Sequence, residues 1–459
     1  MTLHGDSTFT LTQAKSAIPK ELMTGTAHKL FSFLASKIGD FIREHHAEHF
    51  EEDFEHHLRL GFTFSFPVDQ KDINKGYLMR WTKGFDIRDA VGKDVCQLLQ
   101  QEIDALGLPV IVAALVNDTV GTLIARSYTS PGKSGALIGA IFGTGTNGAY
   151  VGELGSITKL FTEKERRFVT STDKMVINTE WGNFDSELRV LPDTPYDRAL
   201  DANSVNPGMQ MFEKRVSGMF LGEIIRNAII GLKESRVGLF EGDCVIINED
   251  AELYREWTID TSFLSNVEVD MSEEFVISRK LFETELGVFG ASPTDVEAVK
   301  IISRAVGRRS ARLAAVPLAA IIMKTKLEEE AQTRTDSLAK QMSRLSFGGD
   351  QQVDYHDTDK RPIGTLVYDA LSAVVARVKA RVAGRTAILV DEAQEMGVID
   401  VGVDGSVVEY YPGFEENLRE ALGEVEHPPN QPIEPRLRIG IAKDGSGVGA
   451  ALIALVASL

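Results

Sequence analysis

The sequence is poor in cysteine, in long apolar runs and in positive charge. Cys96 and Cys244 are the only cysteines among 459 residues, too few for a disulfide framework, so we expect two reduced thiols in a cytoplasmic protein. No apolar run reaches the roughly 18 residues of a membrane span, and residues 1–15 lack the apolar core of a secretion signal. The formal net charge of −18 argues against nonspecific binding to nucleic acid or to anionic membranes.

The order of predicted elements indicates an α/β protein. Hydrophobic residues make up 43% and charged residues 25% of the chain, as in ordinary globular proteins, and the length favours two domains. A stripe of apolar residues predicts a helix over residues 22–46. Residues 110–116 form a continuous apolar run, typical of a strand buried on both faces. Further strands are predicted over residues 8–13, 58–67 and 135–142.

The second half of the chain continues this alternation. Residues 300–323 predict a helix that Pro317 should kink or restart. Short strands are predicted over residues 398–403, 407–411 and 437–442, and a closing helix over residues 447–459. The polar stretch 326–362 predicts a surface loop or a partly disordered insert, followed by helical periodicity over residues 364–382.

Three short patterns suggest other functions and are better explained by turns or polar faces. Residues 143–148 satisfy GxGxxG, but strand-like residues follow where a dinucleotide fold needs a helix. Residues 45–49 satisfy HxxEH, a zinc-peptidase pattern, yet they end an amphipathic helix and fit a solvated polar face. Residues 131–134 resemble the end of a Walker A loop, but Ser127 stands where its first glycine is required.

Stronger signals lie where strands end. Asp118 follows the apolar run 110–116 and precedes a helix, which is where open α/β sheets place their chemistry, although an Asn-Asp pair there can also be a helix cap. Residues 143–147 offer small side chains, backbone amides and hydroxyls that suit a phosphate group. Residues 444–449, at the start of the last helix, have the same character. Taken alone, each of the two segments is more often a tight turn.

Taken in order, these residues resemble the motifs of the hexokinase family. Leu60-Gly-Phe-Thr-Phe-Ser-Phe-Pro67 with Arg80-Trp-Thr-Lys-Gly-Phe85 resembles the family signature. Further matches follow in the family's order: 116–122, 143–147, 178–182, 210–213, 403–406 and 444–447. They span nearly the whole chain except about residues 325–396. Residues 126–133 and 441–449 resemble the glucokinases of filamentous fungi more than hexokinases in general.

The resemblance implies two actin-like ATPase (ribonuclease H-like) domains around a cleft for sugar and ATP. Residues 1–116 would form the small domain, to which the helix 447–459 would return. Residues 117–446 would form the large domain, with an insert at about 325–396. The implied reaction is ATP-dependent phosphorylation of the 6-hydroxyl of glucose, the first step of glycolysis.

The resemblance also implies roles for individual residues. Asp118 would be the general base and Lys83 would hold charge near the sugar and the transferred phosphoryl group. The sugar-binding positions match Ser65, Thr82, Lys83, Asn117, Asp118, Asn147, Glu180 and Glu213. The nucleotide-contacting positions match Thr144, Gly145, Asp404, Gly445 and Ser446, although Asp404 could simply brace a turn. Mg²⁺ would arrive with ATP, and no residue is assigned as a metal ligand or as a contact for a partner protein.

One family segment has no counterpart here. Family members begin with a strand–turn–strand that carries Leu-Gly-Gly-Thr-Asn, the first phosphate loop, whereas residues 1–4 correspond to the end of the second strand and residues 8–13 to the third. We therefore expect an incomplete small domain. A sugar-binding regulator with little phosphotransfer stays open as an alternative. An oxidoreductase would depend on the GxGxxG pattern alone.

Overall fold

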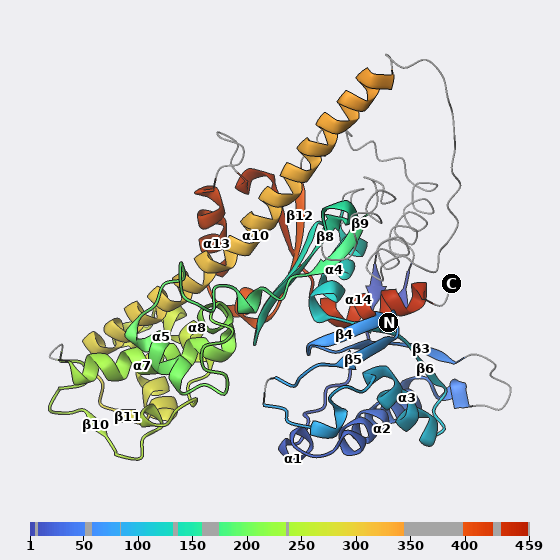
Figure 1. Cartoon of the computed structure of the whole chain (residues 1–459). Helices are drawn as coiled ribbons and strands as arrows, with labels where there is room; N and C mark the ends of the chain where they lie inside the picture. Colours follow the sequence, from blue (N-terminus) through green and yellow to red (C-terminus); the bar gives the residue numbers. More distant parts are fainter. Residues whose placement is uncertain are drawn as a thin grey trace.

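The computed structural model describes residues 1–4, 8–50, 57–82, 84–131, 136–157, 174–235, 238–343, 398–425 and 433–457; for residues 326–343 it describes the backbone. Figure 1 shows two lobes, an N-terminal lobe that holds α1–α3 and β3–β6 and a C-terminal lobe crossed by the long helix α10. Among the described residues, no helix combines the length and the apolarity that crossing a membrane requires.

The N-terminal lobe packs helices against short strands. Its helices are α1 (Lys20–Met23), α2 (Ala27–His45) and α3 (Val95–Ala105), and its strands are β1 (Thr2–Leu3), β2 (Phe9–Thr10), β3 (Leu58–Thr63), β4 (Val68–Asp72), β5 (Lys75–Leu78) and β6 (Val110–Val116). Thr26 caps α2 by accepting a hydrogen bond from the Lys29 backbone N–H. The apolar stripe of α2 is buried against α3 and the strands, with Phe31 and Leu99 1% exposed. The predictions of a helix in 22–46 and of the buried strand 110–116 are confirmed.

The C-terminal lobe is built on a five-stranded sheet in the order β13-β12-β7-β8-β9. Its strands are β7 (Ile138–Phe142), β8 (Thr146–Glu153), β9 (Lys174–Asn178), β12 (Ile399–Asp404) and β13 (Leu437–Ile441). β12 is parallel to both β7 and β13, whereas β7, β8 and β9 pair antiparallel. The carboxyl ends of β7, β12 and β13 therefore meet at one edge of the sheet.

Helices cover this sheet and extend to one side of it. They are α4 (Asp118–Thr129), α5 (Pro195–Ala202), α6 (Glu213–Val216), α7 (Gly218–Glu234), α8 (Thr261–Val269), α9 (Val276–Leu281), α10 (Pro293–Ser343), α12 (Ser406–Tyr410), α13 (Phe414–Gly423) and α14 (Gly445–Val456), with the short pair β10 (Ile246–Ile247) and β11 (Val288–Phe289). The largest apolar cluster joins α7, α8 and α10 to β7 and β12.

The last helix, α14, lies between the two lobes. It packs on α4 and on β3, and its apolar residues share a buried cluster with β6 and α4. The backbones touch at glycines: a Cβ atom on Gly61 would lie 2.1 Å from the Ala450 carbonyl oxygen, and one on Gly121 would lie 2.6 Å from the Ser446 carbonyl oxygen. Only glycine allows these contacts. The division of the chain into domains at residue 116 stays a prediction.

Two predictions of secondary structure are wrong. Residues 407–411 do not form a strand. Instead, the helix α12 follows the turn at Gly405, and Val407 and Val408 are the buried residues of this helix. The predicted surface loop at 326–362 begins as helix, since α10 runs unbroken to Ser343 with Pro317 inside it, so the predicted restart does not occur.

Several other predictions are shortened by the structure or lie beyond its description. The strand predicted over 8–13 is limited to Phe9–Thr10, which pairs with Thr2–Leu3. The closing helix begins two residues earlier than predicted, at Gly445. The helix predicted over 364–382, residues 344–397 of the insert and residues 132–134 of the Walker-like turn lie outside the described residues.

Candidate active site

Asp118 stands where a buried strand becomes a helix. β6 ends at Val116 and α4 begins at Asp118, so the carboxylate lies in the first turn of α4, where the helix dipole favours negative charge. The cap itself is Asn117, whose Oδ1 accepts hydrogen bonds from the Thr119 N–H (3.0 Å) and hydroxyl (2.5 Å). Asp118 Oδ1 accepts from the same N–H at 2.8 Å, so both side chains are oriented by the helix start.

A polar network joins several of the predicted sugar-binding residues. Asn147 Nδ2 donates to Asn178 Oδ1 (2.9 Å) and to Glu180 Oε1 (3.0 Å), and Asn178 Nδ2 donates to the same Glu180 oxygen at 2.8 Å. The Thr119 hydroxyl lies 3.4 Å from Asn178 Oδ1 and so connects the network to α4. Asn178 and Thr119 were not predicted as site residues, although Asn178 is the first residue of a quoted motif.

The backbone at Glu180 is held in a rare conformation. Its φ of 52° lies in the left-handed region, which a non-glycine residue adopts at a cost of about 1–3 kcal/mol. The network above, together with the hydrogen bond from the Thr179 N–H to the Gly148 carbonyl at 2.9 Å, keeps the turn in place. The Glu180 carboxylate is thereby fixed at the exposed end of β9.

Glu213 connects the sugar-binding positions to the predicted phosphate turn. Its Oε2 accepts a hydrogen bond from the Thr146 N–H at 3.0 Å and lies 2.8 Å from where a Cβ on Gly145 would stand. Thr144 and Gly145 form the tight turn between β7 and β8, closed by the Gly143 N–H and the Gly145 carbonyl at 3.0 Å. Because β8 continues as a strand, the expectation that residues 143–148 are not a dinucleotide-binding motif is confirmed.

Ser65 and Thr82 belong to the N-terminal lobe. The Phe64 N–H donates to the Val116 carbonyl at 3.0 Å, so Ser65 leaves β3 beside the end of β6. Aromatic contacts fasten the Thr82 loop to this segment, with ring centroids 4.8 Å apart for Phe66 and Trp81. Lys83 lies outside the described residues.

Asp404 links the two remaining nucleotide-contacting turns. Its carboxylate accepts hydrogen bonds from the N–H of Gly405 (2.8 Å) and of Gly445 (3.0 Å), so it braces the start of α14. Burial raises the pKa of the Asp404 carboxyl above its usual value, against the effect of these two donors. The Ser446 carbonyl accepts from the Thr63 hydroxyl at 3.2 Å, which ties this turn to the N-terminal lobe.

A cavity of about 450 Å³ adjoins the Thr144 turn. Its volume lies within the range of small-molecule sites. Most of its wall was not predicted from the sequence. It is lined by Thr144, Gly218, Met219, Trp257, Thr258, Ile259, Asp260, Thr261, Ser262, Ser265, Ser406, Val407, Tyr410 and Tyr411. The Met219 N–H donates to the Thr144 carbonyl at 3.2 Å, so the cavity is continuous with the predicted phosphate turn.

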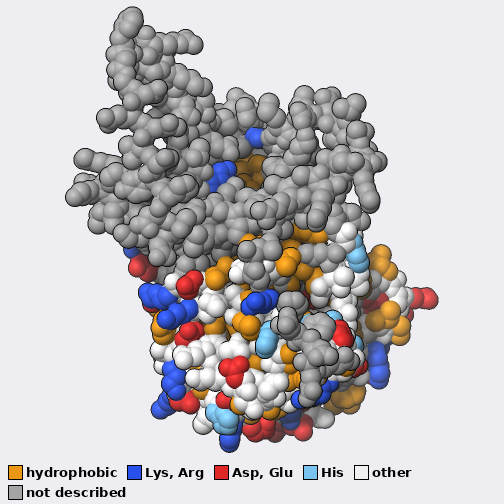
Figure 2. Space-filling model, turned by 90° about the vertical axis from the view of Figure 1, so that its right-hand side faces the viewer, with side chains coloured by type: hydrophobic (Ala, Val, Ile, Leu, Met, Phe, Trp, Pro, Cys, Tyr) orange, Lys and Arg blue, Asp and Glu red, His pale blue; other side chains and the backbone are white. Residues whose placement is uncertain are grey.

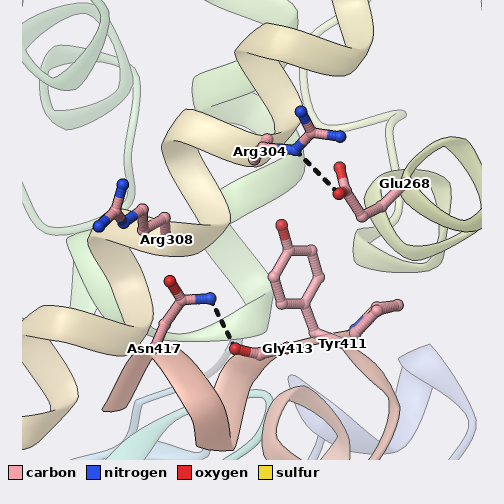
Figure 3. Close-up of a pocket in the computed structure, with 7 residues that line it drawn as sticks. Glu268, Arg304, Arg308, Tyr411, Gly413 and Asn417 are labelled. Carbon is pink, nitrogen blue, oxygen red and sulfur yellow. Dashed lines mark hydrogen bonds and ion pairs between the residues drawn. The ribbon is translucent and has the colours of Figure 1, made fainter. Parts of the chain in front are cut away.

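A second hollow, of about 300 Å³, shares Tyr411 with the Thr144 cavity (Figure 3). Arg304 donates to Glu268 at 3.0 Å there, and Arg308 donates to Glu420 at 3.1 Å. Burial, and then the Glu268 charge, raises the pKa of Tyr411 to about 12. Both guanidinium groups of this hollow already face carboxylates.

The HxxEH pattern lies in the N-terminal lobe, at the end of α2. Polar atoms of His46, Glu48 and His49 lie within 4.8 Å of one another on partly or fully exposed side chains, whereas His45, the first residue of the pattern, does not belong to this group. The solvated polar face stays a prediction. On the face shown in Figure 2, positive and negative side chains of the described residues are interspersed.

Comparisons with known proteins agree with this geometry. Two family models, both described as hexokinase, match residues 1–128 and 137–456. The chain is 48% identical over 476 aligned positions to the glucokinase of Aspergillus niger, covering 99% of this chain and 82% of that protein. It is 40% identical over 479 positions to glucokinase-1 of Saccharomyces cerevisiae, covering 99% and 81%.

The solved structures include a hexokinase from Schistosoma mansoni in complex with glucose, with a TM-score of 0.68 and 29% identity over 97% of this chain and 78% of that one. The two lobes therefore have the actin-like ATPase fold of the sugar kinases. The chain belongs to the hexokinase family.

Proposed function

We propose that this chain transfers the γ-phosphoryl group of MgATP to the 6-hydroxyl of glucose. The observation that carries the proposal is the continuous arrangement of Asp118, the Asn147–Asn178–Glu180 network and the Thr144 turn at one edge of the fold. Glucokinase relatives match over 99% of the chain, which supports glucose as the sugar.

In this mechanism the Asp118 carboxylate accepts the proton of the 6-hydroxyl as that oxygen attacks the γ-phosphorus. A carboxylate held by its own helix start is oriented before the sugar arrives, so little reorganisation is needed. Lys83 would stabilise charge on the transferred group. Asn117, Asn147, Glu180 and Glu213, with Ser65 and Thr82 from the other lobe, would hold the remaining hydroxyls.

The nucleotide would occupy the Thr144 cavity. Backbone N–H groups of the Thr144–Gly145 turn and the Gly445–Ser446 turn suit the phosphates, because small residues let the backbone approach closely. Mg²⁺ would enter with ATP as part of the substrate, where it neutralises phosphate charge. Asp404 would act indirectly, by holding the Gly445 turn in place.

A coupled assay for glucose 6-phosphate tests the proposal. The purified chain should form product only when glucose, ATP and Mg²⁺ are all present. A sugar-binding regulator of the same fold would instead give heat on calorimetric titration with glucose and no product. If the chain gives no heat with glucose and forms no product, both functions are excluded.

We further propose a cytoplasmic location, supported by the buried free thiol of Cys96 and the exposed one of Cys244.

A further inference from the structure

Trp257 presents an unusually exposed indole to the Thr144 cavity. The indole-bearing residue is 38% exposed, whereas Trp181 in the core is 6% exposed. It lines the same cavity as Thr144 and Met219. A tryptophan left partly in water within a cavity is available to a ligand with an apolar face.

The chain holds Trp257 in a strained conformation. Its φ of 63° lies in the left-handed region, which tryptophan rarely adopts. The Trp257 N–H donates to Glu223 Oε2 at 2.8 Å, and Glu223 is 2% exposed and ion-paired with the buried Arg226. A buried charge pair thus fixes the backbone from which this exposed side chain projects.

The next residues are fastened to the same helix, α7. A Cβ atom on Gly222 would lie 2.0 Å from the Ile259 carbonyl oxygen, so the segment that follows Trp257 contacts the backbone of α7 directly. Arg226 also donates to the Leu253 carbonyl at 3.2 Å. The backbone that carries the indole is therefore fastened to α7 on both sides of residue 257.

Packing leaves at least one face of the indole uncovered by aromatic neighbours. Among the described residues, its aromatic contact is with Phe220, with ring centroids 6.1 Å apart and planes at 72°. An edge-to-face pair occupies at most one face of either ring. Tyr410, 63% exposed on α12, lines the same cavity, and so do the polar residues Thr258, Asp260 and Ser262.

We propose that Trp257 is the stacking platform for the base of the nucleotide and sets a preference for purines. The inference rests on the proposed function, since it takes the Thr144 turn to hold the phosphates. A flat base stacked on the indole removes apolar area of both from water, and a purine covers more of it than a pyrimidine. The nearby hydroxyl and carboxylate groups then meet the polar edge of the base.

Fluorescence tests the stacking directly. At saturating glucose, titration with MgADP should quench the tryptophan emission of the wild type. The quench should persist in Trp81→Phe, a control that removes an indole from the other lobe, and disappear in Trp257→Phe. A quench that survives in Trp257→Phe overturns the proposal.

Kinetics provide a second readout. Trp257→Leu keeps apolar bulk without an aromatic face, and should raise KM for ATP by about ten-fold while KM for glucose and kcat change little. The wild type should prefer ATP and GTP to CTP and UTP, and this preference should shrink in the variant. Unchanged KM for ATP contradicts the proposal even if glucose is phosphorylated. A wild type that forms no glucose 6-phosphate refutes the proposed function instead.

Discussion

The contact of α14 with α4 permits a sharp test by a single methyl group. A Cβ atom on Gly449 would lie 2.0 Å from the Gly121 carbonyl oxygen and 2.4 Å from the Gly121 Cα. Both partners are backbone atoms, so no side-chain rotation can relieve the overlap. Ordinary contact begins at 3.4 Å, and the helices must separate by about 1.4 Å, from 2.0 to 3.4 Å, to admit Gly449→Ala.

Overpacking of this kind costs about 1–3 kcal/mol. For a domain of this size a loss of 1 kcal/mol lowers Tm by about 2–4 °C, so Gly449→Ala should lower Tm by several degrees. The displaced helix begins at the Gly445–Ser446 turn, which is proposed to contact the nucleotide. KM for ATP should therefore rise together with the loss of stability.

Gly447→Ala is the matched control for stability on the same helix. Among the described residues, no atom beyond its chain neighbours and its own helix backbone lies within 4 Å of a Cβ on Gly447, and alanine in a helix gains about 0.5–1 kcal/mol over glycine. Thermal denaturation should show Tm unchanged or raised for Gly447→Ala and lowered for Gly449→Ala. Equal Tm values for the two variants would refute the close backbone contact.

Three further outcomes follow from buried or networked groups. Asp400, 3% exposed, accepts hydrogen bonds from two arginines and a serine, so Asp400→Ala should lower stability by about 3–5 kcal/mol in denaturant titration; a loss below about 1 kcal/mol contradicts this. Burial, and then a neighbouring aspartate, raises the pKa of Cys96 to about 12, so the thiol stays protonated at pH 8. A thiol reagent should then modify Cys244 alone in the folded chain and both cysteines after denaturation; rapid native reaction at Cys96 refutes its burial. Asn178→Asp places a second carboxylate beside Glu180 and should raise KM for glucose several-fold with less effect on kcat; an unchanged KM excludes a positioning role.

The apolar run before Asp118 predicted both the strand and the helix that follows it, because a continuous run fits few alternatives. The β-branched residues at Val407 favoured the prediction of a strand. This preference depends on context, and the local packing after the Gly405 turn favours a helix instead. Residues 326–343 were predicted as part of a surface loop because they are polar. Their Glu, Lys, Gln and Ala content favours helix, and this propensity extends α10.

The sequence predicted only part of the site, because several of its contacts depend on which strands and segments pair in the fold. Motif order indicated Asn147 and Glu180, but their connection through Asn178 depends on the pairing of β8 with β9, which the sequence does not display. Asp404 as a brace was one of two explanations, and its hydrogen bond to Gly445 arises from strands adjacent only in the folded sheet. Trp257 belongs to no motif, and its place in the cavity depends on the fold of the α7–α8 connection.

The central claim is that Asp118 removes the proton from the sugar hydroxyl, and Asp118→Asn tests it most directly. The amide keeps the size of the side chain but cannot accept the proton. In this variant, kcat for glucose 6-phosphate formation should fall by about 10²–10⁴-fold, while calorimetry should give a glucose Kd within a few-fold of the wild type. Asp243→Asn, at an exposed aspartate in a remote loop, should leave both values unchanged. A kcat for Asp118→Asn equal to that of the wild type would contradict the account.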